Sequence, residues 1–265
     1  MGWTTITEAF RSLRSRGEGA LVAYLMGGDP DPPRSLEYLC AAAEGGADLL
    51  EVGIPFSDPV ADGPTIQAAG TRALRAGTTT EAVLELVRSL KRDYNLPVVL
   101  MGYYNPILRF GEDTFCAEAA ECGVDGLIVP DLPPEEAAPL RDAAERVGLG
   151  LVFLATPETV GQRLDLILRY TRGFLYLVSR YGTTGEREQL SGEITRLVGR
   201  VRERGGTVPI AVGFGISRPE HIRAVLAAGA DGAVVGSRLV REVGKGAPPE
   251  ALARLVRELK AATLP

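Results

Sequence analysis

The sequence predicts a (β/α)8 barrel, also called a TIM barrel, and three observations predict it. The first is a junction in which a helical stretch ends in glycine and a short step through aspartate leads into an apolar run. It occurs at Gly46-Ala47-Asp48, Gly123-Val124-Asp125 and Gly229-Ala230-Asp231. Glycine adopts the left-handed conformation that ends a helix, so each junction is typical of a βα unit. The second and third are about eight short apolar runs and the amphipathic stretches between them.

The expected strands are short and follow one another at the spacing of βα units. In order, they are Ala20–Leu25, Leu49–Gly53, Pro97–Met101, Gly126–Val129, Gly150–Ala155, Phe174–Val178, Pro209–Val212 and Ala233–Gly236. An open doubly wound sheet is the alternative architecture. No linker-like or low-complexity segment interrupts the pattern, so we expect one domain spanning residues 1–265.

The expected helices show apolar residues at helical spacing. Ile6, Phe10 and Leu13 share one face before the first strand, which predicts an extra N-terminal helix that covers the bottom of the barrel. Two later stretches repeat the spacing, with Val83, Leu86, Val87 and Leu90 in one and Leu252, Leu255, Val256 and Leu259 in the other. Capping boxes are expected at Thr5-x-x-Glu8, Thr78-x-x-Glu81 and Ser217-x-x-Glu220.

Composition excludes several classes of function. The net charge of -5 and the lack of a basic block argue against nucleic-acid binding. No apolar stretch approaches the length of a transmembrane helix, and the N-terminus lacks a signal-peptide core. Three cysteines without a CxxC pattern fit a reducing cytoplasm better than a disulfide framework. One histidine and no paired cysteines make a metal site improbable.

A carboxylate interrupts the apolar strand Leu49–Gly53 at Glu51. An ionised carboxylate in a buried strand is costly unless it is paired or neutralised, and a strand that accepts one usually does so at a site of chemistry. No arginine falls inside an expected strand to pair with it. Asp58 and Asp62 lie in the following loop, on the catalytic face of a barrel. Asp58 has the character of a turn former, so Glu51 and Asp62 are the candidate pair, although Asp62 has loop capping as an alternative role.

Glycine-rich loops follow the last three expected strands, at Gly182–Gly185, Gly213–Ser217 and Gly236-Ser237. Backbone N–H groups approach an anion closely where there is no Cβ, and loops after strands seven and eight of such barrels commonly bind phosphate. We therefore expect a phosphate site made of backbone amides and Ser237.

The lysines exclude one reaction class. A Schiff-base aldolase needs a lysine at a strand end. Lys91, Lys245 and Lys260 all fall in expected helices or loops. The carboxylates must then carry the proton transfers themselves.

The stretch from Glu51 to Gln67 closely resembles the signature of the tryptophan synthase alpha chain family. The resemblance continues over nearly the whole chain, through Gly28-Asp29-Pro30, Tyr103, Asn105-Pro106, Tyr176, Ser179-Arg180, Gly213–Ser217 and Gly236-Ser237. It implies a lyase of tryptophan biosynthesis that cleaves indole-3-glycerol phosphate to indole and D-glyceraldehyde 3-phosphate in a retro-aldol reaction.

The resemblance also implies roles for individual residues. Glu51 is expected to protonate indole C3 and to take the proton from the glycerol hydroxyl, and Asp62 to accept the indole N–H hydrogen bond. The remaining implied site residues are Tyr176 and Thr184 beside the substrate, Gly185, Gly215, Gly236 and Ser237 around the phosphate, and Tyr24, Met101, Tyr103 and Leu127 in the indole slot. Tyr24 is a departure, because the family often has Phe there.

The family further implies a beta-chain partner in an alpha2–beta2 heterotetramer, with pyridoxal phosphate on the partner and no cofactor in this chain. The Pro55–Pro59 loop and the Asn105–Arg109 region are expected to face that partner. Two other functions stay open. An indole-glycerol-phosphate synthase would be expected to use a strand-end lysine, which is absent. A non-catalytic sugar-phosphate-binding regulatory subunit would need neither Glu51 nor Asp62.

Overall fold

The computed structural model describes residues 2–178, 187–204, 206–213 and 215–265. Within them, nine parallel strands form one sheet in the order β5-β4-β3-β2-β1-β9-β8-β7-β6. The strands are β1 (Ala20–Met26), β2 (Leu49–Gly53), β3 (Val98–Met101), β4 (Gly126–Ile128), β5 (Gly150–Val152), β6 (Leu154–Ala155), β7 (Leu175–Val178), β8 (Ile210–Gly213) and β9 (Gly232–Val235). They match the expected strands closely, with one exception.

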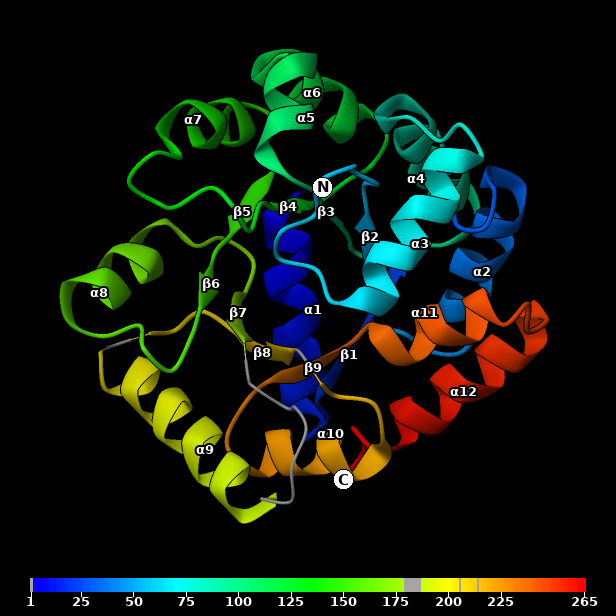
Figure 1. Cartoon of the computed structure of the whole chain (residues 1–265). Helices are drawn as coiled ribbons and strands as arrows, with labels where there is room; N and C mark the ends of the chain where they lie inside the picture. The colour runs from blue at the N-terminus through cyan, green and yellow to red at the C-terminus, as the bar shows by residue number, and fades with distance from the viewer. Residues whose placement is uncertain (1, 179–186, 205, 214) are drawn as a thin grey trace.

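The exception is the expected strand Gly150–Ala155, which is divided at Phe153. Its first half, β5, pairs with β4, and its second half, β6, pairs with β7. Because only one residue separates the halves, the sheet returns on itself as a barrel, as Figure 1 shows. This confirms the predicted barrel and excludes the open doubly wound sheet.

The helices form an outer ring around the strands (Figure 1). Their bounds in the described residues are α1 (Trp3–Ser15), α2 (Pro32–Glu44), α3 (Pro64–Arg75), α4 (Thr80–Asp93), α5 (Tyr104–Phe110), α6 (Glu112–Glu121), α7 (Ala138–Arg146), α8 (Gly161–Tyr170), α9 (Arg187–Glu203), α10 (Pro219–Ala227), α11 (Ser237–Gly244) and α12 (Pro249–Ala261).

The N-terminal helix α1 is not part of the outer ring of helices (Figure 1). Its buried residues Ile6, Phe10 and Leu13 pack with side chains from inside the barrel. The rings of Phe10 and Phe174 lie 5.6 Å apart. The expected N-terminal helix is therefore confirmed, and it fills the end of the barrel at which the strands begin.

Each glycine–aspartate junction makes the same pair of hydrogen bonds at that end. The Asp48 N–H donates to the Leu21 carbonyl at 2.9 Å, and the Leu21 N–H donates to the Asp48 carboxylate at 2.7 Å. Asp231 and Ile210 exchange the same two bonds, at 2.8 and 2.7 Å. The junction thus joins each new strand to its neighbour, which explains why aspartate recurs there.

The expected capping boxes are wrong in detail. Helix α1 begins after Gly2, so Thr5 lies inside the helix. Helix α4 is capped by Thr79, whose side chain accepts from the Ala82 N–H at 3.3 Å. Helix α10 begins after Arg218 without a side-chain cap, and Ser217 lies one residue before that position.

Candidate active site

Glu51 points into the barrel because of its position in β2. Side chains alternate across a strand. Leu49 packs inside the barrel, whereas Leu50 and Val52 pack against the outer helices. Glu51 shares the phase of Leu49, so its carboxyl faces inward. It is 1% exposed, and its Oε2 has no hydrogen-bond partner in the described residues.

The environment of Glu51 favours the neutral carboxylic acid. Burial, aided by the negative charge of Asp62, raises the pKa of Glu51 to about 8. A carboxyl of this kind is protonated at neutral pH, and its pKa is close enough to neutrality for it to give up the proton during a reaction. These are the properties of a general acid–base group.

Asp62 lies in the loop between β2 and α3, close to the start of that helix. Burial raises its pKa to about 6, and the Tyr103 hydroxyl opposes this shift by donating a hydrogen bond to the carboxylate. The same hydroxyl accepts from the Ala61 N–H at 3.0 Å. Tyr103 therefore holds the loop and the carboxylate together. Near neutral pH the two acidic groups differ, with Asp62 ionised and Glu51 protonated.

Both carboxylates line one cavity of about 110 Å³. Its other lining residues come from the carboxyl ends of the strands and from the loops that follow them: Tyr24, Gly63, Ile66, Met101, Tyr176, Gly215, Ile216, Val234, Gly236 and Ser237. In a parallel barrel this is the end that carries active sites.

Six further residues of the expected site line this cavity: Tyr24, Met101, Tyr176, Gly215, Gly236 and Ser237. Tyr103 does not line it directly and instead contacts Asp62. Leu127 lies elsewhere, in the core between sheet and helices, because its neighbour Ile128 takes the inward position in β4. Thr184 and Gly185 lie outside the described residues.

Four lining residues were not predicted from the sequence: Gly63, Ile66, Ile216 and Val234. Val234 occupies an inward position of β9, and the alternation along that strand could have identified it. Ile66 lies in the first turn of α3, after the Asp62 loop. The course of that loop brings Ile66 to the cavity, and no periodicity in the sequence indicates this.

Two glycines make room for the aromatic walls. A Cβ on Gly213 would collide with the Tyr176 hydroxyl, and a Cβ on Gly53 would collide with the Tyr24 hydroxyl. The phenols can therefore lie directly over strand backbone. Burial raises the pKa of both tyrosines well above the usual range, so both remain protonated donors.

The part of the cavity lined by Gly215, Gly236 and Ser237 has the features of an anion site. Helix α11 begins at Ser237, so its first N–H groups are directed toward the cavity that Ser237 lines. Gly215 follows β8 with a φ of 79°, a conformation that favours glycine. No lysine or arginine is among the lining residues of the described cavity.

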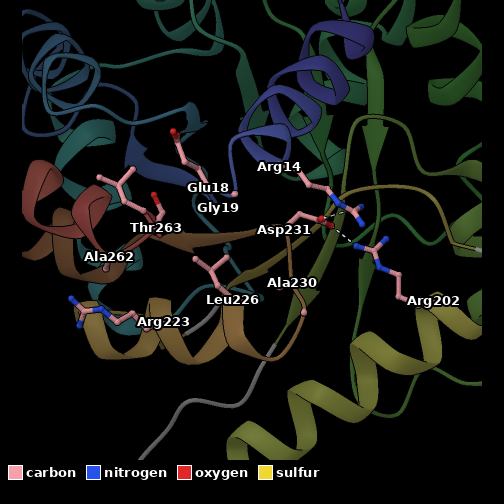
Figure 2. Close-up of a pocket in the computed structure, with 13 residues that line it drawn as sticks. Arg14, Glu18, Gly19, Arg202, Arg223, Leu226, Ala230, Asp231, Ala262 and Thr263 are labelled. Atoms are coloured by element: carbon pink, nitrogen blue, oxygen red, sulfur yellow. Dashed lines mark hydrogen bonds and ion pairs between the residues drawn. The ribbon is translucent and has the colours of Figure 1, made fainter.

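A second hollow, of about 420 Å³, lies at the opposite end of the barrel (Figure 2). In Figure 2, Asp231 points between Arg14 and Arg202, and it forms ion pairs with both. Asp231 also accepts from the Ile210 N–H. The charge of Asp231 is therefore neutralised at the strand junction. Among the described residues, this hollow has no buried carboxyl oxygen without a partner, unlike the cavity around Glu51.

Two further kinds of site are absent from the described ranges. Among these residues, no group of three or more His, Cys, Asp or Glu side chains could hold a metal ion. No helix in the described part of the chain is long and apolar enough to cross a membrane.

Comparison with known proteins gives one consistent result. Residues 10–263 match the family model described as tryptophan synthase alpha chain. A relative of that name from Methanosarcina barkeri is 49% identical over 256 residues, which cover 96% of this chain and 95% of the relative.

Solved structures agree. A protein from Aquifex aeolicus superposes with a TM-score of 0.90 at 42% identity, covering 100% of both chains. The tryptophan synthase subunit alpha of Legionella pneumophila superposes with a TM-score of 0.89 at 34% identity, covering 98% of both.

Proposed function

The chain belongs to the tryptophan synthase alpha chain family, and we propose that it catalyses the alpha reaction, the retro-aldol cleavage of indole-3-glycerol phosphate to indole and D-glyceraldehyde 3-phosphate. The observation that carries the proposal is the pair of carboxylates in one cavity, with pKa values of about 8 for Glu51 and about 6 for Asp62. This difference supplies an acid and a base near neutral pH.

Glu51 supplies the proton. Indole is a poor leaving carbanion, so its C3 must be protonated before the C–C bond breaks. A buried neutral carboxyl can deliver that proton. The carboxylate that results then takes the proton of the glycerol hydroxyl next to the breaking bond. The hydroxyl oxygen becomes the aldehyde oxygen, the C–C electrons return to the indole ring, and Glu51 recovers its proton.

Asp62 stabilises the charge that this protonation creates. Protonation at C3 makes the ring nitrogen positive, and the N–H then becomes a strong hydrogen-bond donor. An ionised Asp62, held by Tyr103, accepts that bond and lowers the energy of the indoleninium intermediate.

The remaining cavity residues position the substrate. Tyr24, Met101 and Tyr176 form the walls against which the indole ring packs. Gly215, Gly236 and Ser237 hold the phosphate by backbone N–H groups and a hydroxyl. Thr184 and Gly185, outside the described residues, are proposed to complete the substrate and phosphate contacts. Leu127 is withdrawn from the indole slot because it packs in the outer core.

No cofactor is needed for these steps, and we propose that this chain binds none. We further propose a pyridoxal-phosphate beta chain as its partner, in an alpha2–beta2 assembly. Apolar Val60 and Leu108, which are 84% and 54% exposed, support a docking surface beside the Pro55–Pro59 loop and in the Asn105–Arg109 region. The three free cysteines fit a cytoplasmic location.

Indole release from indole-3-glycerol phosphate tests the proposal, measured with and without a beta chain. Glu51→Gln serves as the inactive variant, and Asp142→Asn, at an exposed position of α7 away from the cavity and the docking surface, serves as its control. We expect indole from the wild type and from Asp142→Asn only. Absence of indole under both conditions, with substrate bound, would favour the non-catalytic regulatory function.

A further inference from the structure

Tyr24 lies next to Glu51 across two neighbouring strands. The two residues are partners in the β1–β2 register, and both line the same cavity. Tyr24 is only 5% exposed. Its side chain therefore shares the interior of the barrel with the carboxyl that carries the proposed chemistry.

The phenol of Tyr24 is held in one place by two glycines. Its hydroxyl lies over Gly53, which is two residues beyond Glu51 on the same face of β2. Its ring lies against Gly236, where a Cβ would come within 3.1 Å of Cδ1. The hydroxyl is thus fixed over the backbone of β2, the strand that carries Glu51.

The Glu51 carboxyl is buried with one oxygen, Oε2, that receives no hydrogen bond from the described residues. A neutral carboxyl tolerates such an environment, but an ionised one is strongly destabilised without hydrogen bonds. Glu51 becomes ionised each time it gives its proton to the substrate. The cycle therefore creates a buried charge, one oxygen of which, Oε2, has no donor among the described residues.

Tyr24 is able to supply that donor. Burial and the charges of Asp62 and Glu51 raise the pKa of Tyr24 well above its ordinary value, so the phenol keeps its proton throughout the working pH range. It can donate a hydrogen bond without transferring the proton.

We propose that Tyr24 is a positioning residue whose hydroxyl donates a hydrogen bond to the Glu51 carboxylate that forms when Glu51 protonates the substrate. The proposal rests on the proposed function. No covalent bond changes at Tyr24, and its proton stays on the phenol oxygen. The hydrogen bond makes the ionised state of Glu51 accessible and directs its second oxygen toward the glycerol hydroxyl.

Tyr24→Phe tests this, because it removes one oxygen and keeps the ring between Gly53 and Gly236. The pKa of Glu51 can be followed by carbon-13 NMR of glutamate carboxyls in the ligand-free chain, with Glu51→Gln identifying the signal. We expect Tyr24→Phe to raise the pKa of Glu51 by about one unit, since a donor that favours the charged form is lost.

Kinetics provide the second readout. The alkaline limb of the pH profile of indole release should move upward by the same amount, while KM for indole-3-glycerol phosphate changes less than about threefold. Tyr38→Phe is the control, because Tyr38 is also buried and its hydroxyl donates to the Ala247 carbonyl at 2.6 Å. It should change neither quantity.

Two results would overturn the role of Tyr24. One is an unchanged Glu51 pKa in Tyr24→Phe, and the other is a raised KM with an unchanged pH profile, which would make Tyr24 only a wall of the slot. A wild-type chain that releases no indole refutes the proposed function instead. The NMR measurement separates the two failures, because it needs no turnover.

Discussion

Asp125 and Val98 exchange two hydrogen bonds at the start of neighbouring strands. The Asp125 N–H donates to the Val98 carbonyl at 2.8 Å, and the Val98 N–H donates to the Asp125 carboxylate at 3.0 Å. The carboxylate also pairs with Lys91 at 2.9 Å and accepts from the Gly2 N–H at 3.1 Å. Asp125 is fully buried, so one side chain joins β3, β4, α4 and the start of α1.

This relationship predicts a stability defect. Asp125→Ala leaves two backbone N–H groups without their acceptor and the Lys91 ammonium without its counter-charge, with only the Leu96 carbonyl remaining to it. We expect a loss of about 3–5 kcal/mol in the free energy of unfolding. Asp142→Ala, at an exposed position, should change it by less than about 0.5 kcal/mol. Urea unfolding of both variants makes the comparison. Equal stabilities would show that the junction is dispensable.

The same cluster shows why part of the fold could be predicted. Each junction carries its signal locally, because glycine ends the helix and aspartate begins the strand. The partners could not be predicted, since Lys91 and Asp125 are 34 residues apart. The start of α1 was missed for the same reason, because Gly2 donates to Asp125 across the chain.

A site residue could be predicted from the sequence where its chemistry is unusual for the element that carries it. Glu51 stands out as a carboxylate in an apolar strand, and the structure places it in the cavity. Leu127 has no such signal. Its strand β4 has three residues, Gly126–Ile128, too few for alternation to reveal which face is inward. The division at Phe153 is likewise invisible in a continuous apolar run, because it arises from closure of the barrel.

Glu51→Gln should abolish indole release while raising stability. The amide cannot exchange a proton with the substrate, so we expect kcat to fall by about a hundredfold or more. The unfolded chain loses the Glu51 proton near pH 4.5, whereas the folded chain keeps it to about pH 8. Stability of the wild type therefore falls as the pH rises through this interval.

The glutamine variant lacks this pH-dependent loss. Its stability advantage should grow between pH 4.5 and about 8 and then level off. Thermal unfolding at several pH values measures it. A constant difference across the interval would mean that Glu51 is not a buried neutral carboxyl in solution.

The pH profile of kcat/KM should be bell-shaped. Asp62 must be ionised to accept from the indole N–H, so activity should rise through about pH 6. Glu51 must be protonated to act as the acid, so activity should fall through about pH 8. The apparent values belong to the interacting pair. In Asp62→Asn the alkaline limb should move downward, because the negative charge that helps raise the pKa of Glu51 is gone.

Asp62→Asn should lower kcat more than it raises KM. The asparagine keeps the size of the side chain and the contact with Tyr103, yet it lacks the charge that stabilises an indoleninium. Loss of a charge-assisted hydrogen bond predicts a decrease of about tenfold to a hundredfold in kcat. Steady-state kinetics measure both constants. An unchanged kcat would assign Asp62 to loop capping.

Ser237→Ala should weaken substrate binding with little effect on kcat. Ser237 lines the cavity at the start of α11, where a hydroxyl and the first N–H groups of the helix can share one phosphate. A hydrogen bond to a charged group contributes about 1.5–3 kcal/mol, so KM should rise about tenfold or more. Ser12→Ala, on the exposed face of α1, is the control.

Whether Ser237→Ala changes KM or kcat shows which part of the substrate Ser237 contacts. The phosphate lies away from the breaking bond, so its contact should be equally strong in the bound substrate and in the transition state. Inorganic phosphate should therefore inhibit the wild type competitively and inhibit Ser237→Ala more weakly. A fall in kcat at constant KM would mean instead that Ser237 contacts the reacting part of the substrate, and the phosphate would then have to bind elsewhere along the cavity.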